Sequence, residues 1–225
     1  CEILVVTLGL NKDIVNCVAY LNYPNLISVW PVSKSRTAAQ RLYFQFCGDL
    51  GLNKLKPRLS QLLDEFEPDI LHTNNLAGIG MSVWELANKR NIPVVHTIRD
   101  YFQICARQSM MDRGVNCERQ CLKCKVLTRE RKIKSSFVNH VVGNSSHTLQ
   151  AHLQENYFQN ANSSVISGGL DDSYLYHSGK KDALNCIGYI GQIIPSKGVE
   201  DILKLAVQTN STVRIAGNHD GEYAS

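Results

Sequence analysis

The segments PDILHT (residues 68–73), MSVWELANKR (residues 81–90) and PVVHTI (residues 93–98) follow one another closely and decide the fold. The first and third are short and rich in β-branched residues, whereas the second spaces its apolar residues along one helical face. Strands that alternate with helices through short connections are typical of right-handed βαβ units in a parallel sheet. The sequence therefore predicts an α/β fold around this stretch.

The same alternation extends in both directions along the chain. Residues 55–66 space their leucines as a helix buried on one face does, and Pro68 ends that helix. Ser145 is a suitable N-cap for a helix that carries Leu149 and Leu153. The other elements expected are strands at 3–8, 18–29, 140–143 and from residue 165, and helices at 37–50 and 126–136.

A polar stretch near residues 169–182 separates this part from a second, shorter one. Strand-like residues 187–190, a helix-like segment at 198–207 and strand-like residues 212–216 then repeat the alternation. This second part is about 40 residues long, below the size at which a core usually stands alone. We therefore expect two domains, 1–168 and 169–225, with the second only partly present and the chain a fragment.

Composition narrows the class of protein further. Hydrophobic residues make up 44% and charged residues 20% of the 225 residues, as in soluble globular proteins. No run approaches the roughly 18 apolar residues of a membrane span, and a net charge of +4 does not call for a nucleic-acid partner. Four of the eight cysteines crowd into one short segment, which favours a reducing compartment, so we expect a cytoplasmic protein.

The segment GYIGQIIPSKG (residues 188–198) joins a predicted strand to a predicted helix. A glycine at the end of a parallel strand lets backbone N–H groups approach a phosphate, the helix N-terminus adds donors, and Lys197 adds a charge. Gly191, Gln192 and Lys197 are therefore candidates for binding a phosphate group. The spacing matches neither a dinucleotide loop nor a Walker loop, so a plain turn with a solvated lysine remains an alternative.

Polar residues also follow two strands of the first part. His72, Asn74 and Asn75 come after one strand, and Arg99 and Asp100 come after the next. Open α/β sheets bind ligands at the carboxyl ends of their strands, so these side chains are candidates for contacting a hydroxylated ligand. Turn hydrogen bonds made by Asp100 and the asparagines are the alternative.

Cys105, Cys117, Cys121 and Cys124 lie in an insertion that spans about residues 99–125. Loops of that length in compact domains are usually functional or tied down. Four thiolates are able to hold a structural zinc ion or an iron–sulfur (Fe-S) cluster, and a C-x-x-C pair is common in both. Disulfides and free thiols remain open as alternatives.

These motifs resemble those of a known family, in the same order and over nearly the whole chain. Residues 68–75 are similar to its P-D-[IV]-[IV]-H-x-H-N segment, and residues 93–101 to its P-V-V-x-T-x-H-D-x-W segment. Residues 165–171 stand where V-I-P-N-G-V-D crosses between domains, and residues 188–198 resemble F-V-G-R-L-x-x-E-K-G. The chain thus resembles the retaining group 1 (family 4) glycosyltransferases of bacterial polysaccharide assembly, which have the GT-B fold.

The resemblance implies two Rossmann-like domains, an acceptor-side N-terminal one and a C-terminal one that binds a nucleotide-sugar donor. It implies transfer with retention, in which cations and backbone amides stabilise the leaving diphosphate and no cofactor is required. Lys197 and Gly191 match its diphosphate-binding positions, and Asp100 matches the aspartate of its H-D pair, which makes Asp100 and Arg99 the catalytic candidates. Because acceptors in this family are saccharides or lipid-linked, it also implies peripheral contact with the inner membrane.

The chain departs from the family pattern at several positions. Gln192 stands where a phosphate-binding arginine is usual, and Arg99 replaces the histidine of the H-D pair. The glycine-rich loop after the first strand and the E-x7-E segment that grips the ribose are absent from these residues. We therefore expect this chain to be inactive alone, and a non-catalytic binding module that keeps the fold is the alternative.

Overall fold

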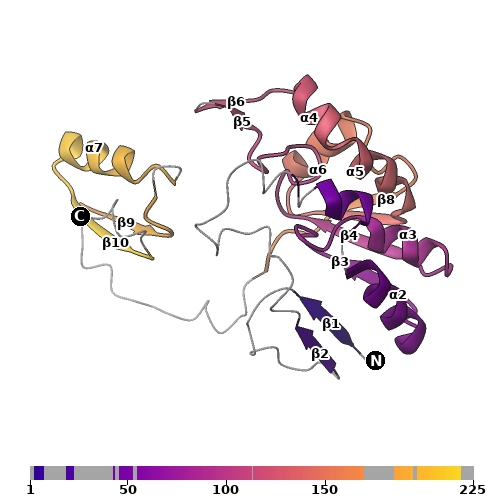
Figure 1. The fold of residues 1–225 in the computed structure, drawn as a ribbon. Helices are drawn as coiled ribbons and strands as arrows, with labels where there is room; N and C mark the ends of the chain where they lie inside the picture. Colours follow the sequence, from indigo (N-terminus) through magenta and orange to yellow (C-terminus); the bar gives the residue numbers. More distant parts are fainter. Residues whose placement is uncertain are drawn as a thin grey trace. The chain divides into compact units, whose positions relative to one another are not determined.

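A computed structural model describes residues 3–7, 19–22, 43, 46–52, 55–112, 114–169, 185–194 and 197–218. The chain divides into two compact units, Cys1–Gly169 and Leu170–Ser225. Each unit contains helices and parallel strands (Figure 1). The expected fold class, α/β with parallel sheets in two units, is confirmed, whereas the acceptor and donor roles of the two domains stay predictions.

The first unit is built on a four-stranded parallel sheet with the order β3-β4-β7-β8. A separate parallel pair, β1 (Leu4–Thr7) and β2 (Ala19–Asn22), lies in the same unit. A strand was expected to begin at Val165, but β8 ends at that residue. The prediction placed the strand too late because β8 lies at the edge of the sheet and most of its residues are polar. The strands of the sheet are β3 (Leu71–Thr73), β4 (Val94–Ile98), β7 (His140–Gly143) and β8 (Asn162–Val165).

Three helices of this unit follow the sequence expectation closely. Helix α2 (Leu55–Phe66) has the predicted bounds and buries its leucines, α3 spans Ser82–Asn88, and α6 spans Ser146–Gln154. Ser145 caps α6 as predicted, because its Oγ accepts the N–H of Thr148 at 3.2 Å. Of the expected helix at 37–50, only Tyr43 and residues 46–50 are described, and they are helical.

The core of the first unit lies between these helices and the sheet. At the edge of this core, the backbones of Gly80 and Gly48 lie in close contact. A Cβ on Gly80 would lie 2.1 Å from the carbonyl oxygen of Gly48, and the φ of +86° at Gly80 also favours glycine. The largest fully buried apolar side chains of this core are those of Trp84, Tyr157, Phe102, Phe158, Leu55, Met81, Ile98 and Ile104.

The insertion after β4 contains structure that the sequence analysis missed. Strands β5 (Met111–Asp112) and β6 (Val115–Asn116) form an antiparallel hairpin. The helix expected at 126–136 begins earlier and is divided at Thr128, whose φ of −110° and ψ of 13° lie outside the helical range. Its parts are α4 (Leu122–Leu127), α5 (Arg129–Lys134) and the 3₁₀ turn η1 (Ser135–Phe137).

The second unit contains β9 (Cys186–Ile190), α7 (Val199–Thr209) and β10 (Thr212–Ala216), with the two strands paired in parallel. These bounds agree with the expected strand–helix–strand pattern to within two residues at each end. The predicted linker lies almost wholly outside the described residues. Among the described helices of both units, none is long and apolar enough to cross a membrane.

Candidate functional site

Polar side chains gather at the carboxyl edge of the first unit's sheet. His72 lies in β3 and its Nε2 is 2.9 Å from Thr97 Oγ1 of the neighbouring β4. Beyond the strand ends, Asn74, Asn75 and Arg99 are exposed. The parallel register of β3 and β4 thus brings the predicted acceptor-side residues to one edge, although their roles stay predictions.

Asp100 lies at the turn that follows β4 and is half-buried. Its Oδ1 accepts the backbone N–H of Phe102 at 2.8 Å, which fixes the carboxylate against the turn. Burial raises the pKa of Asp100, while the Phe102 N–H and the charge of Arg131 oppose that rise. The sequence analysis gave a turn hydrogen bond as the alternative role of Asp100, and the bond to Phe102 is such a contact. It uses Oδ1 and leaves Oδ2 for other contacts.

A buried histidine that the sequence analysis missed lies beneath this edge. His96 Nδ1 is 2.9 Å from Thr73 Oγ1, and His96 Nε2 is 2.6 Å from the amide nitrogen of Gln103. Burial lowers the pKa of His96 to about 3, so the ring is neutral. Thr73 Oγ1, which contacts Nδ1 of this ring, also accepts from Trp84 Nε1 at 3.0 Å. The alternation of β4, which buries Val94, His96 and Ile98 together, was the available signal.

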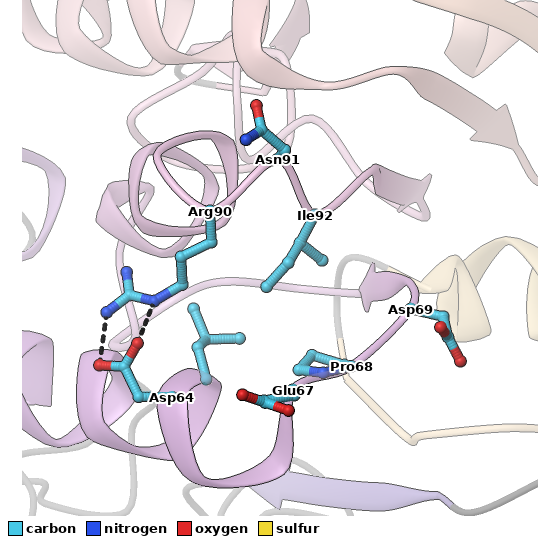
Figure 2. A pocket seen from close by; sticks show the side chains of 8 residues that line it. Asp64, Glu67, Pro68, Asp69, Arg90, Asn91 and Ile92 are labelled. Atoms are coloured by element: carbon cyan, nitrogen blue, oxygen red, sulfur yellow. Dashed lines mark hydrogen bonds and ion pairs between the residues drawn. The ribbon is translucent and has the colours of Figure 1, made fainter.

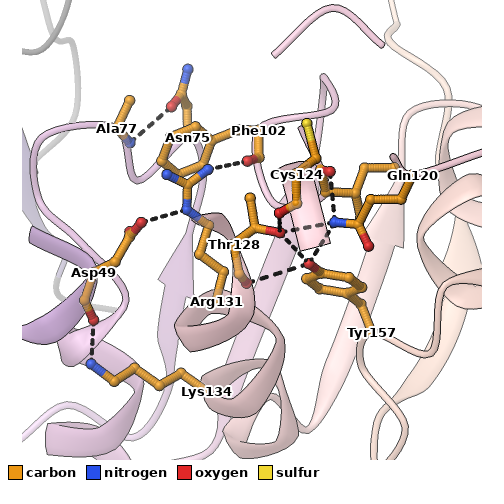
Figure 3. A network of polar contacts seen from close by, with 11 residues as sticks. Asp49, Asn75, Ala77, Phe102, Gln120, Cys124, Thr128, Arg131, Lys134 and Tyr157 are labelled. Carbon is orange, nitrogen blue, oxygen red and sulfur yellow. Dashed lines mark hydrogen bonds and ion pairs between the residues drawn. The ribbon is translucent and has the colours of Figure 1, made fainter. Parts of the chain in front are cut away.

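A buried ion pair between Arg131 and Asp49 lies next to the turn that carries Asp100 and Phe102 (Figure 3). Arg131 is 1% exposed, and its Nε donates to Asp49 Oδ2 at 2.6 Å. Its guanidinium also donates to the carbonyl oxygen of Phe102 and lies 4.1 Å from the centroid of that ring. Burial raises the pKa of Asp49 against the opposing effect of Arg131, and burial lowers the pKa of Lys134, which donates to the backbone of Asp49. Arg131 therefore connects helix α5 to the turn that carries Asp100.

The four cysteines of the insertion are free thiols, and only Cys105 among them is buried. Cys121 is the N-cap residue of α4, and N–H groups of the first turn lower its pKa, while burial raises the pKa of Cys124 to about 11. Within the described parts of the chain, no group of three or more His, Cys, Asp or Glu side chains is arranged to hold a metal ion. The predicted zinc or iron–sulfur site at Cys105, Cys117, Cys121 and Cys124 is therefore not supported.

Hydrogen bonds of buried polar residues hold the insertion in place. Gln120 Nε2 donates to the carbonyl of Ile104 at 2.7 Å. The same nitrogen lies 2.8 Å from Thr128 Oγ1 and 3.1 Å from Tyr157 OH (Figure 3). Thr128 in turn donates to the carbonyl of Cys124 at 2.7 Å. The expectation that something must hold this loop was reasonable, but its polar residues do so through a buried network.

The candidate phosphate site of the second unit lies where β9 and β10 end. The N–H of Gly191 donates to the carbonyl of Ala216 at 3.0 Å. A Cβ on Gly217 would lie 1.7 Å from the carbonyl oxygen of Gly191, so only two bare backbones fit side by side here. Gln192 is exposed and follows directly. The Tyr189 side chain lies against Gly191, and its OH donates to the carbonyl of Gln192 at 2.7 Å.

Lys197 lies in the same connection as Gly191, one residue before Gly198. Gly198 precedes α7 with a φ of +70°, a conformation that favours glycine. Lys197 itself is exposed, and the first N–H groups of α7 lack partners within the helix. Glu200 and Asp201 in the first turn favour the helix but oppose a bound anion, so a phosphate here needs the charge of Lys197.

A hollow of about 560 Å³ lies at the opposite end of the first sheet, where β3 and β4 begin (Figure 2). Arg90 lines this hollow and forms an ion pair with Asp64 through two hydrogen bonds. Its Nε donates to Asp64 Oδ1 and its Nη2 to Asp64 Oδ2, both at 2.7 Å. Glu67 and Asp69 add two further carboxylates to its wall. Since none of the candidate residues lines this hollow and its charge opposes a diphosphate, we do not assign it to the functional site.

Comparison with known proteins identifies related sequences. The profile of Glycosyltransferase Family 4 matches residues 24–174. An uncharacterized 42.6 kDa protein in the cps region of Klebsiella pneumoniae is 27% identical over 210 residues, which cover 92% of this chain and 55% of that protein. The chain thus spans about half the length of this relative.

Solved structures show a more distant likeness. The UDP-N-acetylglucosamine 2-epimerase from Rickettsia bellii is 12% identical, with a TM-score of 0.45, over 94% of this chain and 54% of that one. The S. aureus MnaA-UDP co-structure is 9% identical, with a TM-score of 0.42, over 93% of this chain and 50% of that one. At these values the likeness supports no statement about chemistry.

Proposed function

We propose, because the chain belongs to Glycosyltransferase Family 4, that it is part of a glycosyltransferase that uses a nucleotide-sugar donor. The acceptor is a saccharide or a lipid-linked saccharide, and transfer retains the configuration of the sugar. The place of the Klebsiella relative in a cps region supports a role in polysaccharide or glycoconjugate assembly. No cofactor takes part in the proposed transfer.

The observation that carries the donor assignment is the connection after Gly191, which ends with Lys197 and Gly198 at the start of α7. Because the N–H of Gly191 is taken up by the carbonyl of Ala216, the main-chain donors proposed for a diphosphate are those at the start of α7. Lys197, in the same connection, supplies the positive charge that offsets the charge gained by the leaving diphosphate. Gln192 contributes hydrogen bonds without charge, so Lys197 supplies most of the electrostatic stabilisation from this connection.

The acceptor side is assigned to the carboxyl edge of the first unit. Asp100 is held by Phe102 and, through Phe102, by Arg131, so its carboxylate has a fixed direction. A fixed, half-buried carboxylate suits hydrogen bonding to an acceptor hydroxyl, and Arg99 adds a positive charge beside it. His72 and the amides of Asn74 and Asn75 supply further donors and acceptors for a sugar.

Backbone amide mapping by NMR tests the donor assignment. We expect UDP- or GDP-sugars to shift the amide signals of Gly191, Gln192, Lys197 and Gly217 in a saturable manner, with weak affinity. Lys197→Ala should weaken binding by about tenfold, the loss of about 1.4 kcal/mol of a charge-assisted contact. Lys132→Ala, which removes an exposed lysine from α5 of the first unit, is the control and should leave binding unchanged. An absence of shifts at these four residues would contradict the assignment.

A non-catalytic binding module is the second candidate. Gln192 in place of a cationic residue and Arg99 in place of a histidine favour it, because both changes alter positions matched to the family's reacting groups. Such a module would bind the donor at the same residues, but the protein containing this chain would transfer no sugar. Release of nucleoside diphosphate in the presence of an acceptor separates the two candidates.

A further inference from the structure

The first turn of α4 brings two of the four cysteines of the insertion together. Cys121 is the N-cap residue of this helix, and Cys124 lies three residues later, inside it. The N–H of Lys125 donates to the carbonyl of Cys121 at 2.9 Å, so a helical hydrogen bond closes the turn. Side chains with this spacing are neighbours, and the two thiols share a hydrogen bond. Their spacing also falls within the range of Cα separations that a disulfide bridges.

The two thiols differ in exposure and in acidity. Cys121 is exposed, whereas Cys124 is half-buried. The backbone N–H and the thiol of Cys124 both lower the pKa of Cys121, while burial raises the pKa of Cys124 to about 11. An accessible, more acidic thiol beside a less acidic one suits a reaction in which the first sulfur attacks and the second resolves the product.

Basic side chains surround this pair. Lys123 stands between the two cysteines in the sequence, Arg119 precedes them by two residues, and both are exposed. The charge of Arg107 also acts on Cys124. Positive charge near a thiol favours the thiolate, which is the nucleophile in thiol–disulfide exchange. It also attracts small anionic partners, such as glutathione disulfide.

The backbone on both sides of the pair is anchored. Gln120, the residue before Cys121, is buried, and its Nε2 donates to the carbonyl of Ile104 at 2.7 Å. The carbonyl of Cys124 accepts from Thr128 Oγ1 at 2.7 Å and from the Thr128 N–H at 2.9 Å. The two sulfurs therefore stay close together while the face that carries Cys121 remains open to solvent.

We propose that Cys121 and Cys124 form a thiol–disulfide exchange site for low-molecular-weight disulfides. The Cys121 thiolate attacks one sulfur of the small disulfide, whose S–S bond breaks, so a mixed disulfide forms and the leaving thiolate takes up the proton that Cys121 lost. Cys124 then attacks Cys121 Sγ, and its proton goes to the second leaving thiolate. One small disulfide is thus reduced to two thiols, and the two cysteines are oxidised to one disulfide. The reaction requires neither a sugar donor nor an acceptor.

Reaction of the 225-residue protein with glutathione disulfide, followed by mass spectrometry, tests this proposal. Trypsin cleaves after Arg119, Lys123 and Lys125, so peptides 120–123 and 124–125 stay joined only if the disulfide has formed. We expect the joined product, and its loss on reduction with dithiothreitol. Cys124→Ser should stop at the mixed disulfide, with glutathione on Cys121. Cys121→Ser should react at least about tenfold more slowly, because the more acidic thiol is gone.

The matched controls remove other half-buried thiols. Cys186→Ser changes β9 and Cys117→Ser changes the insertion, and both variants should form the joined peptides at an unchanged rate. Circular dichroism checks that each variant is folded. Equal rates for Cys121→Ser and Cys186→Ser, a disulfide from Cys121 to Cys117 or Cys105 instead, or about one equivalent of zinc that is lost in Cys121→Ser would overturn the proposal. Donor binding at Lys197 would be unaffected by any of these results.

Discussion

Helices α2 and α5 attach to the same unit by opposite means. Helix α2 buries Leu55, Leu59, Leu62 and Leu63, so its attachment depends on apolar area, which is non-directional. Helix α5 buries Arg131 and Lys134, so its attachment depends on hydrogen bonds of fixed geometry to Asp49 and Phe102. The difference indicates that α5 fixes the orientation of the Asp100 turn, whereas α2 contributes stability.

The largest effect is expected where a buried charge loses its partner. Arg131→Met leaves Asp49 buried and unpaired, and we expect the free energy of unfolding to fall by about 3–5 kcal/mol. Urea unfolding followed by circular dichroism measures this. Arg129→Met, at an exposed position of the same helix, should change the free energy of unfolding by less than about 0.5 kcal/mol. A loss for Arg131→Met no larger than for Arg129→Met would show that α5 is not held by its ion pair.

A second test makes the same substitution, leucine to alanine, at a buried position of α2 and at an exposed position of α4. Leu59 in α2 is 6% exposed, so Leu59→Ala should lower the free energy of unfolding by about 2–4 kcal/mol through lost burial and a cavity. Leu122 in α4 is 82% exposed, so Leu122→Ala should cost less than about 0.5 kcal/mol. Similar losses in the two variants would contradict the difference in burial between the leucine of α2 and the leucine of α4.

A smaller effect is expected in the pH dependence of stability. Burial lowers the pKa of His152 to about 4, and its Nε2 is buried without a hydrogen-bond partner. The unfolded chain protonates this ring below about pH 6.5 while the folded chain does not, so stability is complete above that pH and falls as the pH drops toward about 4. His152→Phe should reduce the slope there by about 1.4 kcal/mol per pH unit. Unfolding curves at several pH values measure it, and an unchanged slope would contradict the neutral buried ring.

Periodicity predicted the elements whose apolar pattern matches their burial. Helix α2 and strand β10 have the expected bounds because their spacing follows one period. Helix α4 was placed too late because its inward residues are polar, and β8 because its residues Asn162 to Ser164 are polar at a sheet edge. Two-residue strands such as β5 carry too little pattern to be read from sequence.

The candidate residues could be placed from sequence because each follows a predicted strand. The parallel register then brings His72 and Asp100 to one edge without any further information. The support beneath them could not be predicted, because Asp49 and Arg131 are 82 residues apart and both types of side chain are normally exposed. The metal prediction is not supported among the described residues, and the C-x-x-C spacing does not reveal the hydrogen bonds of Gln120 and Thr128 that hold the loop.

The donor site is the central claim, and an experimental structure of the chain with UDP or GDP tests it most directly. We predict a diphosphate within hydrogen-bond distance of Lys197 Nζ and of the main-chain N–H groups at the start of α7. A diphosphate bound elsewhere, such as in the hollow beside Arg90, or Lys197 directed away from the bound diphosphate, would contradict the account.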